Sequence, residues 1–147
     1  GTPYWDMYSR GAIFGLTRDT GKNHLIKATL ESLAYQSKDV LDAMQKDSGI
    51  QLQKLQVDGG ACANDYLMQF QADVLGVRIE RPEMIESTAI GAAYLAGYGA
   101  GLWSIDEINQ KRKVNQVFEF QRSGEWRAHK SKRWNEAVKR TLNWIEP

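Results

Sequence analysis

The chain has 147 residues, of which 42% are hydrophobic and 25% are charged, and its formal net charge is +1. This length and composition are typical of one soluble globular domain with a real core, and so small a net charge argues against a partner, such as nucleic acid, that is held mainly by electrostatics. We expect no membrane span, because the longest low-charge run, 88–105, is marginal in length and hydrophobicity. The single cysteine, Cys62, cannot form an internal disulfide and favours a cytoplasmic protein.

The first part of the chain is predicted to form a loop, a strand and a long helix. Residues 1–9 are rich in aromatic side chains and lack periodicity, whereas the glycine-bracketed apolar run 10–17 predicts a buried strand. Asn23 is a suitable N-cap for a helix that extends to about Ser48, where Gly49 can end it. Helical spacing gives this helix an apolar face made of Ile26, Leu30, Leu33, Ser37, Val40, Leu41 and Met44.

A strand, two glycines and a second helix follow. The apolar residues of 52–57 predict a short strand, and the spacing of apolar residues in 66–75 predicts a helix with Leu67, Phe70 and Val74 on one face. The turn between them, 58–61, begins with Asp58, Gly59 and Gly60, and ends at Ala61. Glycines let a ligand approach bare backbone, and a helix start offers unpaired N–H groups.

Asn64 follows this turn and carries an amide that can both donate and accept hydrogen bonds. Two interpretations of the stretch stay open from the residues alone. It is either a ligand site, or a tight strand–helix turn in which Asn64 only caps the helix.

The next elements are shorter. Gly76 is placed to end the second helix, and the alternating residues 77–81 predict a half-exposed strand that Pro82 stops. The alanine- and glycine-rich run 89–97 predicts a helix that packs very close to its neighbours or leaves room for a ligand. Tertiary packing must hold that helix, because glycine disfavours helix formation.

The last part of the chain is predicted to contain a short helix, a strand and a long helix. Ser104 and Glu107 have the spacing of a capping box, and 114–120 is strand-like. From Glu125 onward a helix presents an apolar side made of Trp126, Trp134, Ala137, Val138, Thr141, Leu142 and Ile145.

Several polar side chains are interpreted as surface residues rather than as catalytic or ligand-binding residues. His24, Glu31 and Asp39 lie on the first helix and are expected to be solvated or hydrogen-bonded locally. A solvated face is also the stronger interpretation of the basic residues on the last helix, although a nucleic-acid surface is the alternative; they are Lys130, Lys132, Arg133, Lys139 and Arg140. Glu125 and His129 are four residues apart, but two ligands without a third are a weak metal signal.

The order of elements predicts a layered α/β domain in which parallel strands are joined by helical crossovers. Ligands of such sheets bind beyond the carboxyl ends of the strands. The turn 58–60 lies at that edge, which favours the ligand-site interpretation.

Several motifs resemble the FGGY family of carbohydrate kinases. The run 11–16, a spacer of seven residues and then 24–31 match a signature of that family. The similarity is dense over 1–103 and looser beyond it, and it is greatest to those members that phosphorylate glycerol; the matching stretches are 3–6, 10–17, 57–61, 67–71 and 89–97.

The resemblance implies an α/β domain that is part of an actin-like, ribonuclease-H-like fold, with a mixed sheet and helices on both faces. It implies a kinase that uses ATP and Mg²⁺ to phosphorylate glycerol. By this resemblance Gly60 and Asn64 contact the nucleotide, while Gly59 and Ala61 form the wall of its site. The expected partners are glycerol, ATP and an N-terminal kinase domain, and a homo-oligomer is expected.

The same resemblance places the catalytic carboxylate, the phosphate-binding hairpins and the glycerol-binding residues outside this sequence. We therefore expect no catalytic and no metal-binding residue here. Residues 1–147 correspond to the C-terminal portion of the nucleotide-binding domain, and 104–147 to a tail with the last helix. The strand that the resemblance places between 10–17 and 52–58 in the sheet is also outside this sequence. We therefore expect the chain to be a piece of a longer kinase that is inactive alone, or a piece that associates with another chain to cover the open position in the sheet.

Three alternatives remain at this stage. The chain can belong to another FGGY sugar kinase, or it can be a non-catalytic interaction module that keeps the fold. A ribonuclease-H-like nuclease is the third, but it needs several convergent carboxylates at strand ends, and only Asp58 is clearly so placed.

Overall fold

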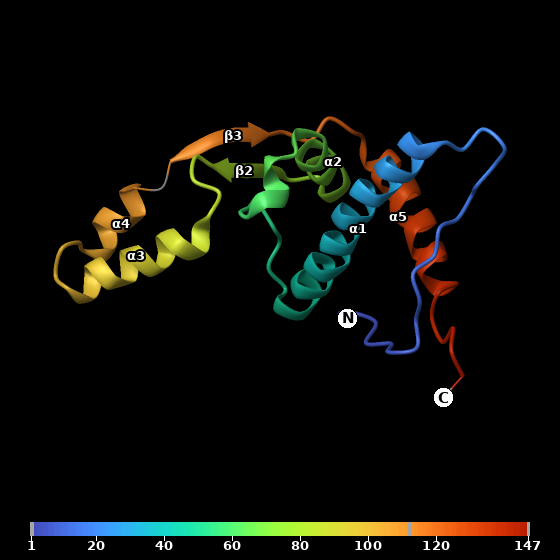
Figure 1. Cartoon of the computed structure of the whole chain (residues 1–147), viewed down its shortest axis with the longest axis horizontal. Coiled ribbons are helices and arrows are strands. Elements are labelled where there is room, and N and C mark those ends of the chain that lie inside the picture. Colours follow the sequence, from blue (N-terminus) through green and yellow to red (C-terminus); the bar gives the residue numbers. More distant parts are fainter. Residues whose placement is uncertain (1, 112, 147) are drawn as a thin grey trace.

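The computed structural model describes residues 2–111 and 113–146. Figure 1 shows a small sheet in the middle of an elongated molecule, with α1 and α5 at one end and α3 and α4 at the other. In chain order the elements are α1 (Lys22–Ser48), β1 (Lys54–Gln56), the 3₁₀ helix η1 (Gly60–Ala63), α2 (Asp65–Leu75), β2 (Arg78–Pro82), α3 (Ser87–Gly99), α4 (Ile105–Lys111), β3 (Val114–Phe118) and α5 (Gly124–Lys139).

The three strands form one mixed sheet in the order β1-β2-β3. Strands β1 and β2 are parallel, with Leu55 opposite Ile79, and β2 and β3 are antiparallel, with Ile79 opposite Phe118. A parallel pair needs a crossover connection, which η1 and α2 supply. The predicted α/β class and its mixed sheet are confirmed.

Helix α2 covers one face of the sheet and supplies much of the core. Its Leu67, Phe70 and Val74 are buried, as their spacing predicts, and they cluster with Ile79 and Phe118 of the sheet. Burying one such side chain stabilises the fold by about 1.5–3 kcal/mol. The prediction that Gly76 ends this helix is also confirmed, since Gly76 adopts a φ of 71° that suits glycine.

The opposite face of β1 and β2 carries charged side chains. The Glu80 carboxylate accepts hydrogen bonds from Lys54 at 3.0 Å and Gln56 at 3.1 Å, and Arg78 approaches it to 3.1 Å. Glu80 is therefore buried, at 6% exposure. This differs from the prediction, because the alternating pattern of 77–81 predicts a half-exposed strand whose charged side chains face solvent. Its cationic neighbours replace water as partners of the carboxylate. Lys54 and Arg78 themselves are half exposed, so no helix of the described residues covers this face at that point.

Helix α1 has the predicted length but a different start. Gly21 is its N-cap and Asn23 lies inside the helix, so the predicted N-cap is wrong. The ring of His24 accepts a hydrogen bond from the Gly21 N–H at 3.1 Å, which satisfies the N–H of the N-cap residue, while glycine itself provides no side-chain cap. Gly49, with a φ of 71°, ends the helix as predicted.

The buried face of α1 differs from the predicted one. Ala34 and Tyr35 are its buried residues, and they pack toward α2 and toward Trp134 of α5. Most of the predicted apolar face is exposed, because no described segment covers that side of the helix; the exposed members are Ile26, Leu33, Val40 and Met44. Periodicity locates an apolar stripe but cannot say which part of it meets a neighbour.

The predicted strand at 10–17 is wrong. Residues 9–16 have no regular secondary structure, and Ile13, Phe14 and Leu16 are between 50% and 61% exposed. A strand is stable only when its N–H and C=O groups pair with a neighbouring strand, and β1, β2 and β3 pair only with one another in the described sheet.

Helices α3 and α4 extend away from the sheet (Figure 1). Close packing at a glycine of α3 is confirmed at one point, where the Trp103 ring lies directly over Gly97. Most of α3 is exposed, however, including Leu95 and Tyr98. The predicted capping box of α4 is confirmed, because Ser104 Oγ accepts from the Glu107 N–H at 3.2 Å and Glu107 accepts from the Ser104 N–H at 2.8 Å.

Helix α5 begins where it is predicted but ends earlier. Ser123 caps it by accepting from the Trp126 N–H at 3.2 Å. It ends at Lys139, so Leu142 and Ile145 lie beyond it rather than on its apolar side. No helix of residues 2–111 and 113–146 is long and apolar enough to cross a membrane.

Candidate functional site

The turn after β1 brings the four predicted site residues together. Gly59 adopts a φ of 80°, a conformation that favours glycine, and its N–H donates to the Ile85 carbonyl at 2.7 Å. Gly60 and Ala61 then open η1, and Asn64 follows it as the N-cap of α2. The predicted site residues therefore form one continuous turn at the carboxyl end of β1.

The front of this turn is open. No atom lies within 4 Å of where a Cβ on Gly59 or Gly60 would be placed, and Gly60, Ala61 and Asn64 are exposed. Glycine is therefore not needed here to make room for the rest of the chain. The bare backbone of Gly60 is available to a ligand that approaches from solvent.

The side chain of Asn64 uses its oxygen within the chain and leaves its NH₂ group available to a ligand. Its side-chain oxygen accepts from the Leu67 N–H at 2.9 Å, so Asn64 does cap α2. Capping uses only the oxygen, and the amide NH₂ has no partner among the described residues' hydrogen bonds. The cap fixes the orientation of the amide, so that toward a ligand Asn64 acts as a hydrogen-bond donor.

A cavity of about 590 Å³ adjoins the turn and separates it from α1. Asp58, Ala61 and Cys62 line one side of it, and apolar residues line most of the rest, among them Leu33, Val40, Leu41, Leu55, Val57 and Leu67. This size lies within the range of sites for small molecules. The candidate site is therefore an exposed glycine turn beside an apolar hollow.

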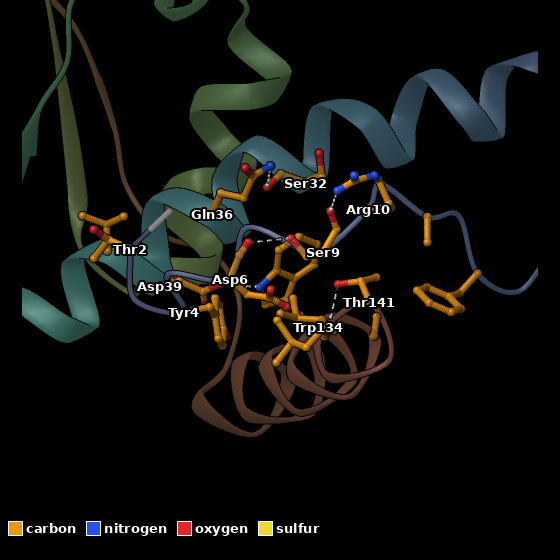
Figure 2. Close-up of a pocket in the computed structure, with 17 residues that line it drawn as sticks. Thr2, Tyr4, Asp6, Ser9, Arg10, Ser32, Gln36, Asp39, Trp134 and Thr141 are labelled. Carbon is orange, nitrogen blue, oxygen red and sulfur yellow. Dashed lines mark hydrogen bonds between the residues drawn. The ribbon is translucent and has the colours of Figure 1, made fainter. Parts of the chain in front are cut away.

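A second cavity, of about 550 Å³, lies between the N-terminal segment, α1 and α5 (Figure 2), and none of the predicted site residues lines it. On its wall the Trp134 indole N–H donates to Asp39 at 2.8 Å, and the Trp134 ring stacks on Tyr35 at 5.0 Å. Burial raises the pKa of Asp39 above its usual value. Asp39 is thus bonded to a residue 95 positions away, so its predicted role as a solvated or locally bonded residue is wrong.

The N-terminal segment and the tail beyond α5 are tied together at the same cavity. Asp6 accepts from the Tyr8 N–H at 2.8 Å and from the Asn143 N–H at 2.7 Å, and these bonds hold its pKa below the usual value. The Ile145 N–H donates to the Tyr8 carbonyl at 3.2 Å. The carboxylates of Asp6 and Asp39 at this cavity are therefore links between distant chain segments.

The two other polar residues singled out on α1 are bonded as follows. His24 accepts from the N–H of Gly21, the N-cap of its own helix, as its local role predicts. Glu31 accepts from the Tyr66 hydroxyl of α2 at 2.6 Å, 35 residues away, so its predicted solvated or local role is also wrong. Burial together with this bond raises the pKa of Tyr66. Within residues 2–111 and 113–146 no three His, Cys, Asp or Glu side chains are grouped as a metal site would require.

One residue of the site was missed by sequence reasoning. Arg81 lies in the alternating stretch that predicts outward charges, yet its side chain is only 12% exposed and donates to the Cys62 carbonyl behind the glycine turn. Its place in a strand two residues after the buried Ile79 is the one signal that could have found it, since alternate residues share a face.

The family model for the FGGY family of carbohydrate kinases, C-terminal domain, matches residues 1–100. The chain belongs to this family, and its fold is part of the actin-like fold of these kinases.

Among its relatives, the glycerol kinase of Enterobacter sp. (strain 638) is 56% identical over 147 residues, which are 99% of this chain and 29% of that protein. The glycerol kinase of Thermoanaerobacter pseudethanolicus is also 56% identical, over 99% of this chain and 30% of that protein. The crystal structure of Plasmodium falciparum glycerol kinase with ADP superposes with a TM-score of 0.86 at 36% identity, covering 99% of this chain and 29% of that one. The chain thus spans less than a third of the length of these relatives.

Proposed function

We propose that this chain is the nucleotide-binding part of an ATP-dependent kinase that transfers the γ-phosphoryl group of ATP to glycerol and forms glycerol 3-phosphate. The open turn at Gly59–Ala61 with Asn64 is the observation that carries the proposal. The relatives named glycerol kinase, one of them solved with ADP, support it.

The turn fits the adenosine end of a nucleotide. A flat base or ribose can lie against the backbone of Gly60 because no side chain stands in front of it. The Asn64 amide can donate to an acceptor on the base or the sugar, and Ala61 adds an apolar wall. Positioning of this kind is the main protein contribution to phosphoryl transfer.

The remaining parts of the kinase are assigned by the same proposal. Mg²⁺, when bound with ATP, neutralises charge on the phosphates. By the resemblance, the residues that bind the phosphates and glycerol belong to an N-terminal kinase domain or to the first part of the C-terminal domain. Residues 104–147 act as a tail that carries the last helix. We place the enzyme in the cytoplasm, which fits a buried free thiol at Cys62. We also expect the enzyme to be a homo-oligomer.

The proposal is tested in a chimera. The Enterobacter enzyme carries this chain in place of the matching 29% of its length, because the two are 56% identical there. The chimera is expected to phosphorylate glycerol with ATP. A chimera that folds and has no ATP-dependent activity contradicts the proposal.

A variant ties the activity to the turn. In the chimera, Gly60→Trp places a large ring where the nucleotide would lie, and the Cβ of the new side chain meets no atom of the chain within 4 Å. We expect kcat/KM for ATP to fall by about a hundredfold or more, roughly 2.7 kcal/mol, with little change in thermal stability. Gly99→Trp is the matched control, since a Cβ on Gly99 of α3 also meets open space. Equal losses in both variants would count against the assignment of the turn.

A further inference from the structure

The guanidinium of Arg81 lies behind the glycine turn and is bonded on several sides. One nitrogen donates to the Cys62 carbonyl at 3.0 Å and to the Asp65 carboxylate at 2.7 Å. The other donates to the Gln116 side-chain oxygen at 2.5 Å. The guanidinium also lies over the Phe118 ring, 5.3 Å from its centre. Arg81 on β2 is thus joined to η1, to α2 and to β3.

The acceptors of these bonds flank Asn64, which is predicted to contact the nucleotide. Cys62 belongs to η1 and Asp65 is the first residue of α2, so the two acceptors lie on either side of Asn64 in the chain. The other end of the turn is held by the bond from the Gly59 N–H to the Ile85 carbonyl, in the loop after β2. The turn is consequently held at both ends by residues that come from β2 and its following loop.

We propose that Arg81 is a positioning residue for the nucleotide, an inference that rests on the proposed function. It does not touch the ligand in this role. It fixes the backbone of η1 and the start of α2, so that Gly60 and the Asn64 amide are in place before the nucleotide arrives. A site that is ordered beforehand avoids the entropy cost of ordering it on binding.

The geometry requires arginine rather than any cation. Its three acceptors are a carbonyl, a carboxylate and an amide oxygen in different elements. A planar fork with five N–H donors can serve all of them at once, whereas the ammonium of lysine is a compact point charge on a flexible stem. Lysine at this position should therefore keep the ion pair with Asp65 but hold the backbone of η1 and the start of α2 less firmly.

The test uses the same chimera with the substitutions Arg81→Gln and Arg81→Lys. Arg78→Gln is the matched control, because Arg78 is on the same strand, is half exposed and pairs with Glu80 on the opposite face of the sheet. For each variant we measure kcat, the KM for ATP, the KM for glycerol and the rise in melting temperature that ADP produces.

We expect the KM for ATP to rise about tenfold in Arg81→Gln and about threefold in Arg81→Lys, with kcat and the KM for glycerol within about twofold. The shift in melting temperature with ADP should shrink in the same order, and the control should match the unsubstituted chimera. A purely structural role lowers the melting temperature but leaves the KM for ATP unchanged, and that result overturns the inference.

Two other results also decide the matter. A parallel rise of both KM values means a general distortion and overturns the inference while the proposed function stands. An unsubstituted chimera without ATP-dependent activity overturns the proposed function, and the inference with it. If Arg81→Gln does not fold, Arg81→Lys decides the question by the same ADP measurement.

Discussion

Asn64 has two separable roles, one on each end of its amide. The oxygen caps α2 through the Leu67 N–H at 2.9 Å, and the NH₂ is the part available to a ligand. An aspartate at this position keeps the capping oxygen and is as good an N-cap as asparagine, but it has no N–H to donate. One substitution can therefore remove the proposed ligand contact without removing the cap.

We expect Asn64→Asp in the kinase chimera to keep its stability and to raise the KM for ATP about tenfold, because the lost donor is worth about 1.4 kcal/mol. Asn64→Ala should lose the cap as well and cost about 1 kcal/mol of folding free energy. Denaturant unfolding and steady-state kinetics on both variants check this. If Asn64→Asp bound ATP normally, Asn64 would be a cap only.

Strand β2 serves both faces of the sheet and shows how one element links core, site and charge cluster. Ile79 is fully buried under α2, and Arg81 on the same face holds the turn. Glu80 points to the other face, where Lys54, Gln56 and Arg78 surround its carboxylate. The hydrogen bond from Lys54, then the bond from Gln56, hold the pKa of Glu80 below its usual value of 4.5.

This lowered pKa predicts an acid-sensitive contribution from β2. The contribution is fully present above pH 4.5, the ordinary value, and is lost as the pH falls through the lower pKa of the folded state. We expect Glu80→Gln to flatten the fall in stability below that pH and to lower stability at neutral pH. Unfolding curves at a series of pH values measure it.

The matched control for this prediction is Glu119→Gln, because Glu119 is exposed just after β3 and makes no ion pair within the described residues. Its curve should follow that of the unsubstituted chain. If Glu80→Gln and Glu119→Gln had the same pH dependence, the cluster around Glu80 would not be the source of the acid sensitivity.

At the scale of the whole molecule, many large apolar side chains are exposed. Leu33 and Val40 of α1 are exposed and line the cavity of about 590 Å³ beside the glycine turn. Ile13, Phe14 and Leu16 of the N-terminal segment are exposed as well. Exposed apolar side chains in this number are typical of an interface with another part of a protein or with another chain.

We therefore expect the 147-residue chain, when prepared by itself, to self-associate at micromolar concentration, because association removes this surface from water. Leu33→Lys combined with Val40→Lys should shift it toward the monomer in sedimentation equilibrium. Leu95→Lys is the control, since Leu95 is also apolar and is even more exposed but belongs to α3. A chain that remains monomeric without any substitution would contradict this expectation.

The sequence by itself determined the features that depend on neighbouring residues. Helix α2, its buried Leu67, Phe70 and Val74, its end at Gly76 and the turn before it all follow from local spacing and capping. The family follows from the same local motifs, because each of them is a short continuous stretch that the family model also matches within residues 1–100.

Only the tertiary structure decided what depends on distant partners. Whether 10–17 forms a strand depends on a neighbour to pair with, and which face of α1 is buried depends on where α2 and α5 pack. Arg81 and Asp39 have their roles because Cys62 and Trp134 are brought to them from 19 and 95 residues away. Periodicity in a single stretch carries no information about such partners, since the fold, and not the local sequence, sets those distances.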